Sequence, residues 1–167
     1  MKTAILVISF GPNPDKKAIL VVSFGTSYAD TREKTIGAIE EDFRSAFPDY
    51  TVRRAFTSGM IIKKLRERDG IEIDTVDEAL EKLYKSGYTD IFCVPTHIMC
   101  GIEYDKACRM IEKFNDKMKI RISRPLVTET SDYYNIVDIF KHRLTDKNRL
   151  YVFMGQRPCC ECRLPCP

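Results

Sequence analysis

The sequence predicts an α/β domain in which helices cover a parallel β-sheet. Short apolar runs alternate along the chain with longer amphipathic stretches, an order typical of strand–helix–strand units. The clearest unit spans residues 18–46, with an uncharged apolar run at 18–24 followed by Gly25 and an amphipathic stretch. An apolar strand without charge is typical of a sheet that is covered on both faces. Ligands of such sheets bind beyond the carboxyl ends of the strands, so residues 23–27 are the first site candidate.

The first helix is expected over residues 28–46. Its large apolar residues recur at helical spacing with charged residues between them: Ile36, Ile39, Phe43 and Phe47. Gly25 permits a tight turn before this helix, and the hydroxyl groups of Thr26 and Ser27 can cap the backbone amides that follow.

Four more strands are expected, at residues 51–56, 90–94, 119–122 and 150–154. Four helices should lie between these strands. One ends by Gly70, the next ends at Gly87, and the last two cover residues 103–115 and 132–144. Thr75, with Glu78 three residues later, forms a capping-box pattern that predicts where the second of these helices begins. This regular alternation ends at residue 155, because residues 156–167 show no periodicity.

The composition is that of an ordinary globular domain. A chain of 167 residues can bury a proper core, and its net charge of +3 is spread along the sequence, so nucleic-acid binding is not indicated. No apolar run is long enough to span a membrane. The short run at residues 4–10 meets a Pro/Asn turn and not a small-residue cleavage site, so a cytoplasmic location is expected.

The amino terminus repeats the first predicted strand. Residues 4–11 match residues 18–25 except that Ile8 stands against Val22, and only the second copy is followed by a helix pattern. An added edge strand and a short duplication both explain the repeat. We favour the duplication and treat residues 1–16 as an appendage.

The cysteines are not expected to hold a metal. Four of the seven lie in the last nine residues, where their spacing is not a usual zinc-ligand spacing and prolines limit how the thiolates converge: Cys159, Cys160, Cys162 and Cys166. The other three read as core or near-core residues: Cys93, Cys100 and Cys108.

Two residues near the predicted sheet edge could carry chemistry. His97 follows the strand at residues 90–94, and an imidazole can exchange a proton near neutral pH or bind a metal. A loop histidine held by hydrogen bonds explains the position equally well. Glu103 begins a helix, where a carboxylate is stabilised by the helix terminus, and position alone favours this capping role. His142, late in a helix, is expected to be solvated.

A third candidate is the turn before the predicted helix that ends by Gly70. Thr57, Ser58 and Gly59 could bind an anion there, although plain capping explains these residues equally well.

Several motifs, in unbroken order over about residues 17–155, resemble the anaerobic-type sirohydrochlorin cobaltochelatases. They are VVSFGTS at 21–27, RAFTSGMII at 54–62, HI at 97–98, G-x-EY at 101–104 and VFMG at 152–155. This family inserts Co²⁺ into sirohydrochlorin during cobalamin biosynthesis and uses two similar α/β domains with the tetrapyrrole between them. The resemblance implies that residues 17–155 form the first domain, a chelatase-like half, and the strand that leads into the second.

The resemblance also implies roles for individual residues. Glu103 is expected on the metal side or in proton handling, and His97 along the substrate cleft. Hydroxyl and backbone N–H groups should bind the carboxylates of the substrate: Ser23, Gly25, Thr26, Ser27, Thr57 and Ser58. Sirohydrochlorin and a divalent metal are the expected partners. Co²⁺ is a substrate in this reaction, and no tightly bound cofactor is expected.

The end of the sequence departs from the family pattern. A principal metal-binding histidine should follow Gly155, but Gln156 stands there, and an amide is a poor cobalt ligand. When codons compatible with residues 156–167 are read one nucleotide later, they permit the family's histidine and the helix start after it. We therefore interpret these residues as a frameshift product. A truncated chelatase with reduced or no activity is expected. The alternative is a non-catalytic tetrapyrrole-binding or self-associating module, because a half enzyme exposes apolar surface.

Overall fold

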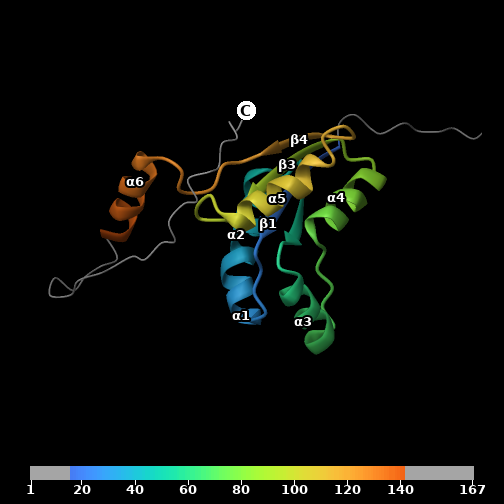
Figure 1. Ribbon diagram of the computed structural model, residues 1–167, viewed down its shortest axis with the longest axis horizontal. Helices are drawn as coiled ribbons and strands as arrows, with labels where there is room; N and C mark the ends of the chain where they lie inside the picture. The colour runs from blue at the N-terminus through green and yellow to red at the C-terminus, as the bar shows by residue number, and fades with distance from the viewer. Residues whose placement is uncertain (1–15, 142–167) are drawn as a thin grey trace, which may run out of the picture.

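The computed structural model describes residues 16–141, which contain a four-stranded parallel sheet (Figure 1). The strands are β1 (Lys17–Ser23), β2 (Thr51–Phe56), β3 (Asp90–Pro95) and β4 (Lys119–Ile122). Their order across the sheet is β2-β1-β3-β4, and every pairing is parallel. The predicted parallel sheet is therefore confirmed. The repeat at residues 1–15, the strand at 150–154, His142 and the tail with Gln156 lie outside the described residues.

The helices begin and end close to where the sequence predicts. They are α1 (Ala29–Arg32), α2 (Ala38–Ala46), α3 (Gly59–Asp69), α4 (Val76–Lys85), α5 (Ile102–Glu112) and α6 (Thr130–Lys141). The capping box before α4 is present, since Thr75 Oγ1 accepts a hydrogen bond from the Glu78 amide and the Glu78 carboxylate accepts one from the Thr75 amide. Within residues 16–141, no helix is long and apolar enough to cross a lipid bilayer.

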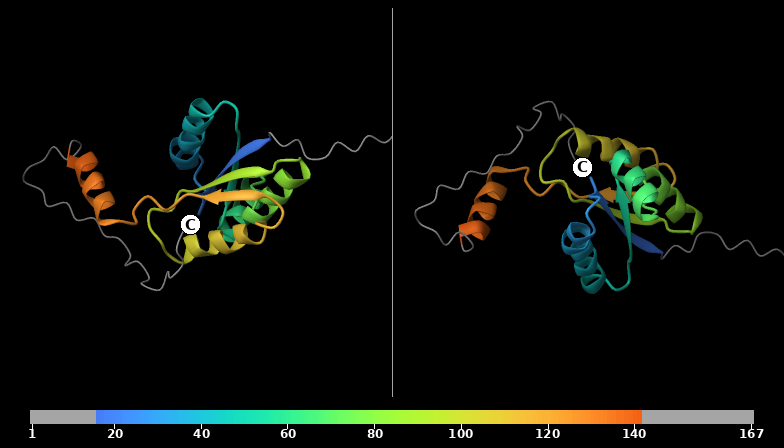
Figure 2. Two further views of the ribbon diagram at one scale, coloured as in Figure 1. Left: turned by 90° about the horizontal axis from the view of Figure 1, so that it is seen from above. Right: turned by 90° about the horizontal axis from the view of Figure 1, so that it is seen from below.

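Helices cover the sheet on both faces (Figure 2). On one face, α4 and α5 pack against alternating residues of β1, so that Ala18, Leu20 and Val22 join one large buried cluster with Leu80 and Ile111. On the other face, α1 and α2 lie over the sheet. A smaller cluster joins the segment between α1 and α2 to β2 and α3: Ile36, Phe56, Ile62 and Leu65. Burial of residues 18–23 of β1 on both faces explains why this run carries no charge.

The first predicted helix is not regular. Residues Glu33–Gly37, between α1 and α2, form a π-helical segment. The wider turn of a π segment changes which residues of the following helix face the sheet. Ile36 is buried, but Ile39 and Phe47 are exposed, and Glu40 is only 3% exposed. The single regular helix expected from the spacing is therefore interrupted, and a carboxylate takes a buried position.

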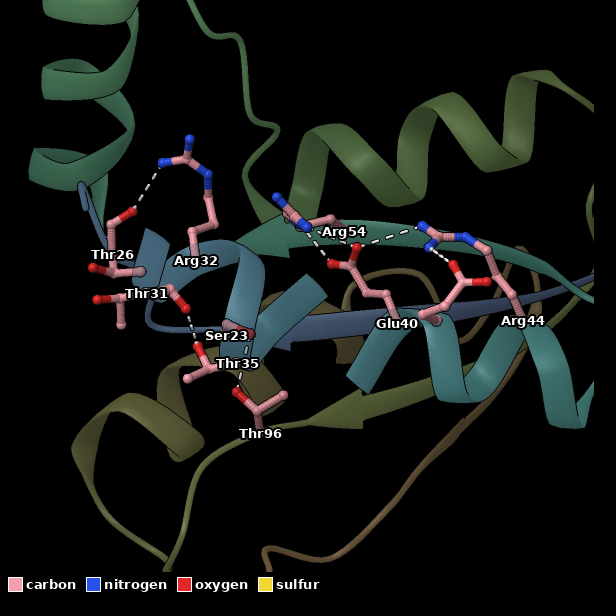
Figure 3. A network of polar contacts seen from close by, with 10 residues as sticks. Ser23, Thr26, Thr31, Arg32, Thr35, Glu40, Arg44, Arg54 and Thr96 are labelled. Atoms are coloured by element: carbon pink, nitrogen blue, oxygen red, sulfur yellow. Dashed lines mark hydrogen bonds and ion pairs between the residues drawn. The ribbon is translucent and has the colours of Figure 1, made fainter. Parts of the chain in front are cut away.

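The buried carboxylate of Glu40 is paired with an arginine of β2 (Figure 3). Arg54 donates from Nε to Oε1 of Glu40 and from Nη2 to Oε2, the second contact at 2.8 Å. Arg44 on α2 also approaches Oε2, at 3.4 Å. A bidentate pair of this kind satisfies a buried charge and fixes its geometry. The Glu40–Arg54 pair joins α2 to the sheet at a buried position that a charged residue occupies in place of an apolar one.

We expect Arg54→Met to lower the free energy of unfolding by about 2 kcal/mol, because it leaves the Glu40 carboxylate buried with Arg44 as its one remaining cation among residues 16–141. Chemical denaturation measures this loss. Arg53→Met is the matched control, since Arg53 is the neighbouring residue of the same strand and is exposed. Equal stability of the two variants would contradict a structural role for the Glu40–Arg54 pair.

Candidate functional site

Hydroxyl groups from adjacent strands meet at the carboxyl edge of the sheet. Ser23 is the last residue of β1, and Thr96 follows β3, its parallel neighbour. Thr96 Oγ1 donates a hydrogen bond to Ser23 Oγ at 3.0 Å (Figure 3). The Ser23 hydroxyl, predicted to bind substrate, thus accepts a bond from a residue that the sequence did not single out.

Backbone hydrogen bonds continue beyond the strands and join their exit loops. The amides of Thr57 and Ser58 donate to the carbonyls of Ser23 and Phe24, at 2.8 and 3.3 Å. The Thr96 amide donates to the Val22 carbonyl at 2.8 Å. The three loops therefore start from fixed positions, as a site on a rigid scaffold requires.

Gly25 makes the tight turn that the sequence predicts, with a φ of +96°. A β-carbon at this position would lie 2.5 Å from the ring of Phe56. Both the backbone conformation and the close approach of a buried aromatic ring require glycine here.

The next residues of this loop are tied down by their backbone. Thr26 Oγ1 accepts a hydrogen bond from the Tyr28 amide at 3.3 Å, a short-range cap of the expected kind. The carbonyls of Thr26 and Ser27 accept from the guanidinium groups of Arg32 and Arg68. Ser27 is buried. The loop is therefore held by α1 and α3.

Glu103 is the second residue of α5, where the helix terminus favours a negative charge. Its Oε2 accepts a hydrogen bond from Thr57 Oγ1 at 3.0 Å. Lys106, one turn later, lies 3.9 Å from the same oxygen and donates to the Thr57 carbonyl at 2.9 Å. Thr57 was predicted to bind substrate, but its hydroxyl is engaged by Glu103. Its neighbour Ser58 is buried and occupies the N-cap position of α3, where its side chain makes no capping hydrogen bond.

His97 lies within the electrostatic influence of this carboxylate, and its ring has no hydrogen-bond partner among the described residues. Both ring nitrogens are buried, and no group among residues 16–141 bonds either one. Burial lowers the pKa of His97, while the negative charge of Glu103 acts in the opposite direction. Tyr104 contacts the ring edge-on at 6.3 Å between centroids. The alternative of a loop histidine satisfied by hydrogen bonds finds no support in this part of the chain.

We expect nuclear magnetic resonance titration of a His142→Gln variant, whose one remaining histidine is His97, to give a pKa below the ordinary value. A histidine in the unfolded chain titrates near pH 6.5. Because the folded pKa is lower, the stabilising contribution of neutral His97 is fully present above that pH and is lost as the pH falls through the folded pKa. Lowering the pH should therefore reduce the free energy of unfolding of the wild type more than that of His97→Gln. Chemical denaturation at a series of pH values measures the difference. A His97 pKa at or above 6.5 would contradict this.

Exposed apolar side chains occur on the segments that follow these strand ends. We call them the apolar rim: Phe24, Tyr28, Met60, Ile98, Ile102 and Leu126. The segments of Ile98 and Leu126 are joined to one another, because the Val127 amide donates to the Ile98 carbonyl at 2.7 Å. Contiguous exposed apolar surface bordered by polar groups is typical of a binding surface.

Among the described residues, no group of three or more histidine, cysteine, aspartate or glutamate side chains could hold a metal ion. His97 and Glu103 offer at most a pair of ligands. The residues that sequence reasoning missed are Thr96 and Lys106. The three-residue spacing from Glu103 to Lys106 on a predicted helix was a usable signal for the second of these.

Comparisons with known proteins agree with the motifs. The family described as cobalt chelatase (CbiK) matches residues 17–158. A sirohydrochlorin cobaltochelatase of Salmonella typhimurium strain LT2 is 44% identical over 143 residues, which cover 84% of this chain and 54% of that protein. The sirohydrochlorin cobaltochelatase CbiKC of Nitratidesulfovibrio vulgaris strain Hildenborough is 35% identical over 89 residues, 53% of this chain and 31% of that protein. The chain thus spans about half the length of the first relative and less of the second.

A solved structure shares the fold. It is a cobalamin (vitamin B12) biosynthesis CbiX protein from Marinobacter aquaeolei VT8, with a TM-score of 0.53 and 17% identity. The match covers 77% of this chain and 94% of that chain. At this identity the likeness shows the fold alone, and the predicted chelatase-like α/β half is confirmed.

Proposed function

The chain belongs to the cobalt chelatase (CbiK) family, and from this premise we propose that it acts in the insertion of Co²⁺ into sirohydrochlorin, within cobalamin biosynthesis. The family match covers most of the chain, but the chain spans about half of the Salmonella protein. Activity, substrate and metal are therefore carried over from longer relatives as a proposal. A cytoplasmic location, with neither nucleic acid nor membrane as a partner, is part of the same proposal.

The observation that carries the proposal is that the buried, unpartnered ring of His97 lies within the electrostatic influence of Glu103 at the carboxyl edge of the sheet. The two side chains are close enough for the charge of Glu103 to act on the imidazole. Both ring nitrogens of His97 are buried without a partner in the described part of the chain, which is costly unless a ligand completes them. An imidazole and a carboxylate are suitable ligands for a divalent transition metal.

The reaction requires this chemistry. Two pyrrole N–H bonds of the macrocycle break, four cobalt–nitrogen bonds form, and two protons leave. The lowered pKa of His97 keeps its imidazole neutral near pH 7, so that it can bind Co²⁺ or accept a proton. The Glu103 carboxylate can take the other role. Co²⁺ enters as a substrate, and no resident cofactor is proposed.

The surroundings suit a large, flat, acidic substrate. The apolar rim can contact the faces of a tetrapyrrole, whose carboxylates lie at its periphery. Beside Glu103, Lys106 supplies a positive charge that can attract a carboxylate of the substrate. The exit loops of β1 and β2 supply the remaining residues that we propose to contact the substrate: Ser23, Gly25, Thr26, Ser27 and Ser58.

A second candidate function is a non-catalytic module that binds tetrapyrrole or associates with a second copy of itself. Two observations favour it. The described residues provide a pair of ligands and no larger metal-binding group. The apolar rim is exposed to solvent, and a second copy could cover it.

One preparation of the full chain separates the two candidates. Co²⁺ insertion into sirohydrochlorin is followed by the change in the absorption spectrum of the macrocycle, and sirohydrochlorin binding is titrated beside it. Binding with turnover supports the chelatase. Binding without turnover, together with self-association in sedimentation, supports the module. Absence of binding, turnover and self-association contradicts both functions. The Salmonella relative serves as the active control.

A further inference from the structure

We propose that Lys106 and Thr57 are positioning residues that hold the Glu103 carboxylate for monodentate binding of Co²⁺. The inference rests on the proposed function, since it assumes that Glu103 meets the metal. In this inference Thr57 orients the metal ligand Glu103, and Lys106 holds Thr57 and Glu103 together.

The contacts form a closed arrangement around one carboxylate oxygen. Thr57 Oγ1 donates to Glu103 Oε2 at 3.0 Å, and Lys106 Nζ lies 3.9 Å from the same oxygen. Lys106 Nζ also donates to the Thr57 carbonyl at 2.9 Å. Three residues from two elements therefore hold one another, with α5 supplying Glu103 and Lys106 and the exit loop of β2 supplying Thr57.

The other carboxylate oxygen is left available. No group among residues 16–141 donates a hydrogen bond to Glu103 Oε1, and the side chain is 38% exposed. A carboxylate whose Oε2 is fixed by a hydroxyl and a nearby ammonium can offer Oε1 to a metal without losing its orientation. The geometry favours one-oxygen coordination over a chelate through both oxygens.

The scaffold beneath Thr57 is itself fixed. Thr57 is 4% exposed, and its amide donates to the carbonyl of Ser23 on the central strand. Glu103 lies in the first turn of α5, whose leading amides have no partner within the helix. Thr57 therefore transmits the position of the sheet to the carboxylate, and Lys106 secures the link.

Two substitutions remove the arrangement, and two matched substitutions preserve it. Thr57→Val removes the hydroxyl with little change in shape, whereas Thr57→Ser keeps it. Lys106→Met removes the ammonium, and Arg109→Met removes an exposed positive charge one turn later on the same helix. Lys106 is 44% exposed, so its variant should fold even where a change at buried Thr57 does not.

The measurement is a titration of each full-length chain with Co²⁺ alone, together with the KM for Co²⁺ and kcat wherever turnover occurs. Groups that orient a metal ligand typically contribute 10-fold or more to affinity, so we expect Thr57→Val and Lys106→Met to weaken Co²⁺ binding about 10-fold. Thr57→Ser and Arg109→Met should stay within about twofold of the wild type. The weakening should appear in the KM for Co²⁺ more than in the melting temperature.

Either of two results overturns the inference. Thr57→Val and Lys106→Met could bind Co²⁺ as tightly as their matched controls, or the wild-type chain could bind no Co²⁺. The proposed function has a separate criterion, which is insertion of Co²⁺ into sirohydrochlorin by the wild type. Insertion that is insensitive to both substitutions refutes the positioning roles alone. The expected pattern of Co²⁺ affinities without insertion refutes the proposed function and keeps the positioning roles.

Discussion

Glu103→Gln is expected to lower kcat/KM for Co²⁺ insertion about 100-fold and to weaken Co²⁺ binding by the chain. The amide keeps the shape of the side chain and its hydrogen bond from Thr57, but it loses the charge that attracts a divalent cation and the ability to accept a proton. Loss of a proton-handling group alone typically costs 100-fold or more. Spectroscopic turnover assays and Co²⁺ titration measure the two effects.

The control for this substitution lies on the same helix. Glu112→Gln makes the same chemical change at the exposed far end of α5 and should leave turnover unchanged. Melting curves establish that both variants are folded. If Glu103→Gln turns over like the wild type, Glu103 has only the helix-capping role that its position at the start of α5 also explains.

Gly25→Ala is expected to reduce the free energy of unfolding by about 3 kcal/mol, the largest loss of stability that we predict for one added methyl group. The left-handed backbone conformation disfavours a β-carbon at this residue. The new carbon would also lie 2.5 Å from the ring of Phe56, a fully buried residue that has little room to move. Urea denaturation measures the loss.

Two other glycines separate the cost of the backbone conformation from the cost of the contact with Phe56. Gly70 has a φ of +65° with nothing within 4 Å of an added β-carbon, so Gly70→Ala should cost about 1 kcal/mol for backbone strain alone. Gly59 has neither the positive φ nor a close neighbour, so Gly59→Ala should be close to neutral. Equal losses in Gly25→Ala and Gly70→Ala would mean that Phe56 moves aside at little cost.

Local patterns in the sequence were sufficient to predict most of the fold. The capping box at Thr75, the uncharged run of β1 and the terminal glycine of α3 each depend on residues that are close together in the chain. The π segment at Glu33–Gly37 was missed because a search at helical spacing assumes 3.6 residues in every turn. The burial of Glu40 follows from that segment and from Arg54, which lies 14 residues away, so no local pattern reveals it.

The candidate site was predicted in part for the same reason. His97 and Gly25 could be placed because parallel strands end at one edge of the sheet. The contact of Thr57 with Glu103 joins residues 46 positions apart and needs the packing of α5 against the exit loop of β2. The orphaned nitrogens of His97 depend on burial by tertiary structure, which the sequence does not show.

The central position of β1 has a consequence for how the protein forms during translation. Both hydrogen-bonding edges of this early strand are completed by later segments, first β2 and then β3, which ends at Pro95. On the ribosome the apolar run at residues 18–22 of β1 therefore emerges long before its second partner exists. A nascent chain that pauses before β3 presents an unpaired apolar edge, the kind of surface that chaperones bind and that other unfinished chains can pair with.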